Sequence, residues 1–116
     1  LRAVQDETAV TALSRRFDVT GVHMFCPGDG CVCCSNFAPL YDIPEECATG
    51  TSNGALTYYL YRRGLVRPGE ETLFMQGEHM HRPSRIRSRL HIAPDGAVTV
   101  RIGGQAVMSL AGHMDI

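Results

Sequence analysis

The chain contains no lysine and no tryptophan, and it has no long hydrophobic run. No apolar stretch approaches the ~18 residues that a membrane-spanning helix needs, and the first residues lack the composition of a signal peptide. The net charge is −1, so the chain as a whole does not attract nucleic acid or anionic lipid. We therefore expect a cytoplasmic protein with no membrane partner and no nucleic-acid partner.

The size and composition are those of one globular domain. The chain has 116 residues, of which 44% are hydrophobic and 20% are charged, values typical of a single folded core. Its five cysteines are an odd number, and three of them crowd together at Cys31, Cys33 and Cys34, which favours free thiols over disulfides. Their spacing also differs from that of paired zinc knuckles, so we expect no metal.

Local patterns predict two helices and a set of antiparallel strands. Apolar residues recur at three- and four-residue steps over 6–17, and again over 51–63, where Arg62, Arg63 and Gly64 form a typical helix end. Turn residues at 27–30 separate two apolar runs, which predicts a β-hairpin. Strands are also expected at 71–77, 84–92, 97–102 and 105–110, with strict alternation over 84–92. Two helices beside mainly antiparallel strands indicate the α+β class.

The segment Cys47-Ala48-Thr49-Gly50-Thr51-Ser52-Asn53 has the composition of a binding site. It opens the second predicted helix, and the first amides of a helix have no internal acceptor and lie at the positive end of the helix dipole. We expect Thr49, Gly50, Thr51 and Ser52 to bind a carboxylate there. The same field favours the thiolate of Cys47, which makes it a candidate base beside the carboxylates of Glu45 and Glu46. The alternative is that these small residues only cap the helix.

Several spaced motifs are similar to a known family. The motifs are Ser35-Asn36-Phe37-Ala38-Pro39, Ile43-Pro44-Glu45-Glu46-Cys47-Ala48-Thr49-Gly50, Gln76-Gly77, Arg82-Pro83-Ser84-Arg85-Ile86 and Val100-Arg101-Ile102-Gly103-Gly104-Gln105-Ala106-Val107. In order and spacing, they resemble the C-terminal half of PhzF-like (phenazine biosynthesis) isomerases, which are related to diaminopimelate epimerases.

The resemblance implies a fold and a kind of reaction. PhzF-like proteins have two similar domains, each a curved, mostly antiparallel sheet wrapped around a central helix, and a cleft between the domains. Groups from both sides of the cleft move a proton on a small amino or carboxylic acid, without a metal or organic cofactor. Residues 1–116 would form a single domain, the C-terminal half of such a protein.

The resemblance also implies roles for particular residues. Glu46 falls where an aspartate usually assists proton transfer, and Gly50 and Thr51 fall where amides hold the substrate carboxylate. Cys47 replaces a proline that is usual in PhzF-like proteins, whereas the related epimerases have a catalytic cysteine there. Asn36 stands where arginine is usual, and His81 stands where glycine is usual.

Two functional hypotheses follow from these observations. The first is an isomerase or epimerase domain that acts on a small carboxylate-bearing substrate and is inactive without its N-terminal half or a second copy in a homodimer. The second is a non-catalytic domain that keeps the fold and binds small anions or dimerises.

Two other groups of residues have simpler interpretations. The arginines at 85, 87, 89 and 101 would lie on one sheet face, but no aromatic residue alternates with them as in single-strand binders. A solvated face, or one opposite acidic residues, is the favoured interpretation. His79 and His81 lie in a loop without periodicity and are expected to be exposed.

Overall fold

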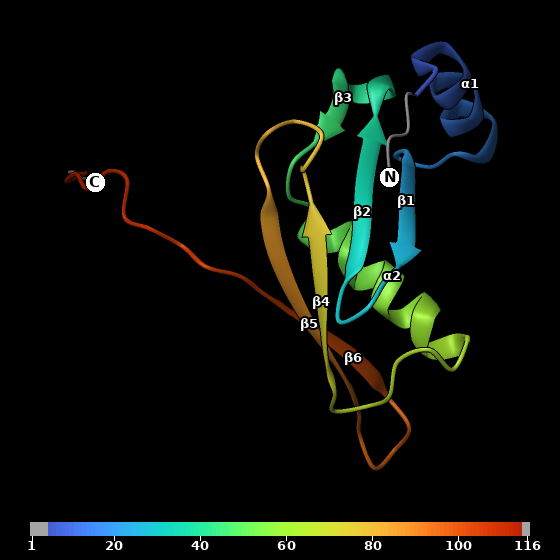
Figure 1. Cartoon of the computed structure of the whole chain (residues 1–116), viewed down its shortest axis with the longest axis vertical. Coiled ribbons are helices and arrows are strands. Elements are labelled where there is room, and N and C mark those ends of the chain that lie inside the picture. Colours follow the sequence, from blue (N-terminus) through green and yellow to red (C-terminus); the bar gives the residue numbers. More distant parts are fainter. Residues whose placement is uncertain (1–4, 115–116) are drawn as a thin grey trace.

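The computed structural model describes residues 5–114 and contains two α-helices and a six-stranded sheet (Figure 1). No helix in this range is long and apolar enough to cross a membrane. The elements in chain order are α1 (Glu7–Phe17), β1 (Val22–Pro27), β2 (Val32–Ala38), the 3-10 turn η1 (Pro39–Tyr41), β3 (Ile43–Glu46), α2 (Gly50–Arg62), β4 (Glu71–Gln76), β5 (Ser84–Ile92) and β6 (Val98–Gly103).

Helix α1 begins and ends where its sequence predicts. The Asp6 carboxylate accepts a hydrogen bond from the Ala9 amide at 3.0 Å, and Asp18 ends the helix in the left-handed conformation. Its predicted apolar face is nevertheless largely exposed, with Leu13 at 44% and Phe17 at 62%. The helix instead buries Ser14 and lies beside η1 and β2. Periodicity identified the helix but did not identify its contact face.

The sheet has the strand order β1-β2-β4-β5-β6, with β3 paired to the end of β2. The predicted hairpin is confirmed, because Val22 to Pro27 pair antiparallel with Phe37 to Val32. Strands β2 and β4 are parallel, and the segment that connects them includes α2, as parallel neighbours require a crossover. The remaining pairs are antiparallel, so the α+β class and the mostly antiparallel sheet are confirmed.

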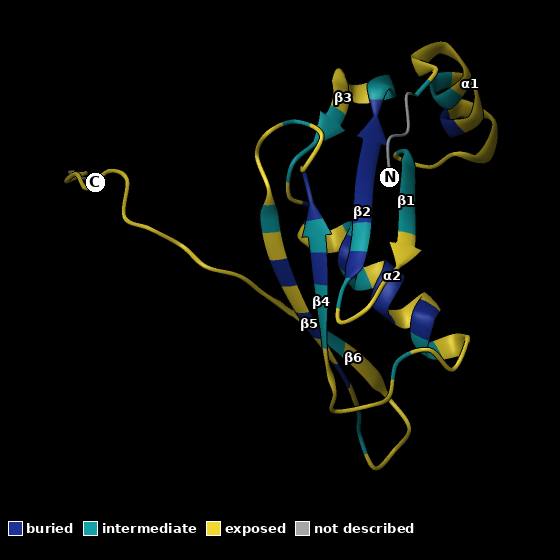
Figure 2. Ribbon diagram, viewed as in Figure 1, coloured by how far each residue is buried: buried dark blue, intermediate teal, exposed yellow. Residues whose placement is uncertain are grey.

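Helix α2 lies across one face of this sheet, behind it in Figure 1. Its buried residues Leu56 and Leu60 pack on the inward-facing side chains of three strands, and the cluster is Val32, Cys34, Leu56, Leu60, Phe74 and Ile86. Strand β5 confirms the predicted alternation, since Ile86, Ser88 and Leu90 are buried while Arg85, Arg87 and Arg89 are exposed (Figure 2). The core therefore lies between α2 and the sheet.

Two predictions about strands were incomplete or wrong. No strand was expected over 43–46, yet these residues form β3, because they return along the end of β2. The strand predicted at 105–110 does not form. Residues 104–114 extend away from the sheet, at the red end of the ribbon in Figure 1, and Val107 and Leu110 are 90% and 86% exposed. An apolar segment forms a strand only beside another strand, and no described strand pairs with residues 105–110.

Candidate functional site

The start of α2 is accessible and lacks a side-chain cap. Thr49 is the N-cap residue, yet its side chain makes no capping bond to the helix. Asn53 donates the first backbone bond, to the Thr49 carbonyl at 3.3 Å. Within residues 5–114 the amides of Gly50, Thr51 and Ser52 have no recorded acceptor, and Gly50 and Thr51 are exposed. Three unpaired amides at the positive end of a helix are suited to an anion.

Thr49 does not cap the helix because its polar groups bind elsewhere. Its hydroxyl donates to Oε2 of Glu46 at 2.5 Å and accepts from Nε2 of Gln76 at 2.9 Å. Its amide donates to Oε1 of Gln76 at 3.3 Å. Thr49 was expected to offer its amide to a ligand, and this expectation is wrong because the amide is buried and already bonded. Thr49 instead positions Glu46.

Gln76 holds the loop before α2 from the sheet side. It is fully buried, at 0% exposure, on the inner face of β4. Its Nε2 also donates to the Glu46 carbonyl at 2.7 Å, and its Oε1 also accepts from Nδ2 of Asn53 at 2.8 Å. One side chain thus connects Glu46, the N-cap and the first turn of α2.

His23 on β1 completes a closed ring of hydrogen bonds. Its Nε2 lies 3.2 Å from Oδ1 of Asn53, and its Nδ1 lies 3.0 Å from Oδ1 of Asn36. Asn36 in turn donates from Nδ2 to Oε2 of Glu46 at 3.4 Å. Burial lowers the pKa of His23 below its ordinary value, and the hydrogen bonds to Asn53 and Asn36 act in the opposite direction. The ring links a titratable imidazole to the Glu46 carboxylate.

Glu46 and Cys47 have different surroundings. The Glu46 carboxylate is part-buried and receives two donors on one oxygen, Thr49 and Asn36. Cys47 packs against Gly77, where an added Cβ would lie 2.9 Å from the Cys47 Cβ and 2.8 Å from its carbonyl oxygen. Gly77 also has φ +80, so the turn after β4 requires glycine there. The loop that carries Cys47 can therefore lie directly on the sheet end.

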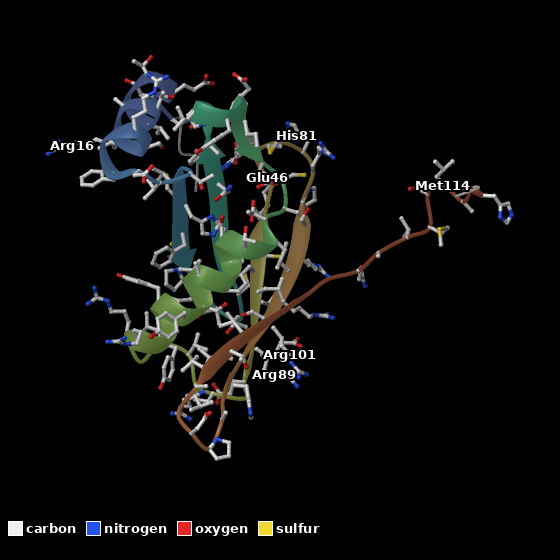
Figure 3. All side chains as sticks on the ribbon, turned by 180° about the vertical axis from the view of Figure 1, so that it is seen from behind. Arg16, Glu46, His81, Arg89, Arg101 and Met114 are labelled. Carbon is white, nitrogen blue, oxygen red and sulfur yellow. The ribbon has the colours of Figure 1, made fainter. Side chains whose placement is uncertain are left out.

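Two cavities flank the start of α2. One of about 610 Å³ is lined by Ala48, Met75, Ser84, Arg85 and Gly104, among others. The other, about 120 Å³, is lined by His23, Asn36 and Ser52 with residues of the β1 and β2 ends. Figure 3 shows Glu46 at the same end of the sheet as His81, while Arg89 and Arg101 lie at the opposite end. Ala48 lines the larger cavity and Ser52 lines the smaller one, so both cavities lie beside the segment that opens α2.

Several other sequence features lie outside the hydrogen-bond network around Glu46. The four cysteines other than Cys47 are free, as Cys47 is, and burial raises the pKa of Cys34 to about 12. Within residues 5–114 no cluster of three or more histidine, cysteine or acidic residues could hold a metal. Arg87 and Arg89 lie 3.4 and 3.8 Å from the Glu71 carboxylate on an exposed face, and His79 and His81 are exposed, as expected.

Sequence reasoning assigned no role in the site to three residues that organise it: His23, Asn53 and Gln76. A signal was present for two of them. Asn53 shares the inward face of α2 with Leu56 and Leu60, and Gln76 alternates with Phe74 on the inward face of β4. A polar side chain at an apolar core position must have hydrogen-bond partners. That rule marks both residues as parts of a buried network.

The fold and the motifs point to one protein family, and comparison with known proteins identifies it. Residues 7–112 match the family model PhzC-PhzF, described as phenazine biosynthesis-like protein. The chain belongs to this family. The family resemblance seen in the sequence is therefore confirmed.

Relatives of this chain are isomerases. A trans-2,3-dihydro-3-hydroxyanthranilate isomerase of Pseudomonas chlororaphis is 32% identical over 71 residues, which are 61% of this chain and 26% of that protein. An uncharacterized isomerase of Deinococcus radiodurans is 31% identical over 111 residues, 92% of this chain and 36% of that protein. The structure of a predicted epimerase from Pseudomonas aeruginosa matches with a TM-score of 0.54 and 25% identity, over 95% of this chain and 38% of that one. The chain thus spans between 26% and 38% of these proteins.

Proposed function

We propose that this chain is the C-terminal half of a two-domain isomerase that moves a proton on a small carboxylate-bearing substrate without a cofactor. The substrate carboxylate would bind the amides of Gly50, Thr51 and Ser52. Glu46 would accept or donate the proton at a neighbouring carbon, with Cys47 as the second candidate for this role. The substrate of the Pseudomonas relatives, trans-2,3-dihydro-3-hydroxyanthranilate, is the first compound to test.

The observation that carries this proposal is the position of Glu46 relative to the start of α2. Thr49 bonds its hydroxyl to Glu46 rather than to the helix, which leaves the helix amides free and aligns one carboxylate oxygen at the same time. A bound carboxylate at a fixed distance from a general base is what proton abstraction from a neighbouring carbon requires. Glu46 is preferred to Cys47 because the Thr49 hydroxyl holds one of its carboxylate oxygens.

The proposal also requires a second half for the cleft. The chain covers only part of the length of its relatives, and the acid or base on the opposite side of the substrate would come from an N-terminal half or from a second copy. The exposed apolar segment 105–114 supports such a contact, because Val107, Met108 and Leu110 are each more than four-fifths exposed. Isolated exposed apolar residues are ordinary, whereas a run of them suggests a partner surface.

The test is isotope exchange in the complete two-domain protein. Substrate is incubated in deuterated water, and deuterium incorporation is followed by mass spectrometry for Glu46→Gln, Cys47→Ser and the control Glu70→Gln, which changes an exposed turn residue. We expect a loss of at least ~100-fold for Glu46→Gln, typical of removing a general acid or base, and near wild-type exchange for the control. Unchanged exchange in both site variants would refute the catalytic assignment. Binding without any exchange in the wild type would favour the non-catalytic anion-binding domain.

A further inference from the structure

The hydrogen-bond ring around His23 cannot be satisfied by a neutral histidine. Both ring nitrogens lie beside amide oxygens, Nδ1 at 3.0 Å from Asn36 Oδ1 and Nε2 at 3.2 Å from Asn53 Oδ1. A neutral imidazole carries one N–H and therefore can donate only one of these bonds. Either His23 is doubly protonated or one of the two amides must turn around.

The two amides differ in their freedom to turn. Asn53 is buried at 0% exposure, and its Nδ2 donates to the Thr49 carbonyl and to Gln76 Oε1, both at 2.8 Å. Turning Asn53 would break both bonds and place its oxygen against two acceptors. Asn36 has one other recorded partner, the longer 3.4 Å bond from Nδ2 to Glu46. Asn36 is therefore the amide that turns when His23 loses a proton.

We propose that His23 is a proton-dependent positioning residue for Glu46. When His23 is doubly protonated, it donates to Asn36 Oδ1, and Asn36 donates to the Glu46 carboxylate. When His23 is neutral, its proton stays on Nε2 opposite Asn53, and Asn36 turns to donate to the unprotonated Nδ1. The Asn36 oxygen then faces Glu46, which retains only the Thr49 hydroxyl. The consequence for catalysis rests on the proposed function of Glu46.

The surroundings of His23 support a response to pH. Besides the 120 Å³ cavity, His23 lines another cavity of about 330 Å³, together with Phe25 and the α2 residues Ser52, Ala55, Leu56 and Tyr59. From α2, the ionisable residue that lines this cavity with His23 is Tyr59. Glu46 on β3 is separated from His23 by Asn36. The β2 residues that line the smaller cavity with His23 are uncharged. Burial lowers the His23 pKa, so the doubly protonated form accumulates below the ordinary histidine value of about 6.5.

The experiment measures the switch without any turnover. Nitrogen-15 NMR of the chain between pH 4.5 and 8 reports the protonation of both His23 ring nitrogens and the side-chain amide of Asn36. We expect a neutral form protonated on Nε2, and an Asn36 shift with the same midpoint as the ring. The control His23→Gln keeps a donor toward Asn53 but does not titrate, so it should abolish that Asn36 transition. A neutral form protonated on Nδ1, or an Asn36 transition that persists in His23→Gln, would overturn the inference.

A second measurement connects the switch to the proposed reaction. In the complete protein, the change in isotope-exchange rate that follows the titration of His23 should disappear in His23→Gln. The dependence of the exchange rate on substrate concentration should change little. A profile that is unchanged by the substitution would refute the positioning role. Because the NMR titration needs no substrate, failure of the proposed function and failure of the switch are separately detectable.

Discussion

Replacement of Gln76 by leucine tests whether the buried network holds the loop before α2. Leucine has a similar size but makes none of the four hydrogen bonds that Gln76 makes with Glu46, Thr49 and Asn53. Asn53 keeps its bond to the Thr49 carbonyl and the Thr49 hydroxyl keeps its bond to Glu46. The Thr49 amide and the Glu46 carbonyl lose the partners described here, at ~1–3 kcal/mol each.

The expected loss in the free energy of unfolding is therefore about 2–6 kcal/mol, a large part of the ~5–15 kcal/mol of an ordinary domain. Urea unfolding followed by circular dichroism measures it, and with a slope of ~1–3 kcal/mol/M the midpoint should fall by roughly 0.7 M or more. Ser88→Ala is the matched control, because Ser88 is also buried on the inner face of the sheet but has one side-chain hydrogen bond, with Thr57 at 2.6 Å. This substitution should cost ~1 kcal/mol. If Gln76→Leu costs no more than Ser88→Ala, the network does not hold the loop.

Three further predictions follow from other parts of the molecule. Gly77→Ala should destabilise by ~3 kcal/mol or more in urea unfolding, because the new Cβ would lie 2.4 Å from the Arg82 carbonyl oxygen at φ +80. The control Gly96→Ala has φ +85 and nothing within 4 Å of the new Cβ, so it should cost only ~1–2 kcal/mol. Equal costs of the two substitutions would contradict the close approach at Gly77. Iodoacetamide at pH 8, followed by peptide mapping, should label the exposed Cys26 rapidly and leave Cys34 unlabelled until the protein unfolds. The reason is that burial raises the pKa of Cys34 to about 12. Equal labelling rates of the two cysteines would be inconsistent with this burial. Removal of residues 105–116 should leave the unfolding midpoint nearly unchanged, since 105–114 is exposed. It should also weaken self-association in sedimentation experiments. A large loss of stability would mean that the segment packs on the domain.

Local patterns predicted most of the fold because they depend on near neighbours in the chain. The alternation of Ile86 and Leu90 with arginines identified β5, and the Asp6 cap identified the start of α1. The segment 105–110 is also rich in apolar residues but forms no strand, because strand formation depends on a partner that local sequence does not specify. The exposed face of α1 was mispredicted for the same reason.

The candidate site was predicted only in part. The loop Glu46 to Ser52 was identified from its composition and its position before a helix, and the amides of Gly50, Thr51 and Ser52 are available as expected. The partners that organise it come from β1, β2 and β4, so His23, Asn36 and Gln76 converge only after the sheet forms. A single sequence contains no record of that convergence. The engaged Thr49 amide follows from the same long-range contact.

The most direct test of the account is an amide NMR titration with a small carboxylate, the substrate of the Pseudomonas relatives. Trans-2,3-dihydro-3-hydroxyanthranilate is added to nitrogen-15-labelled chain, with its methyl ester, which lacks the carboxylate, as the control. We predict that the largest shifts occur at the Gly50, Thr51 and Ser52 amides, that the Thr49 amide shifts less because it is bonded to Gln76, and that the ester has little effect. Shifts that avoid the start of α2, or equal shifts with the ester, would contradict a carboxylate site there.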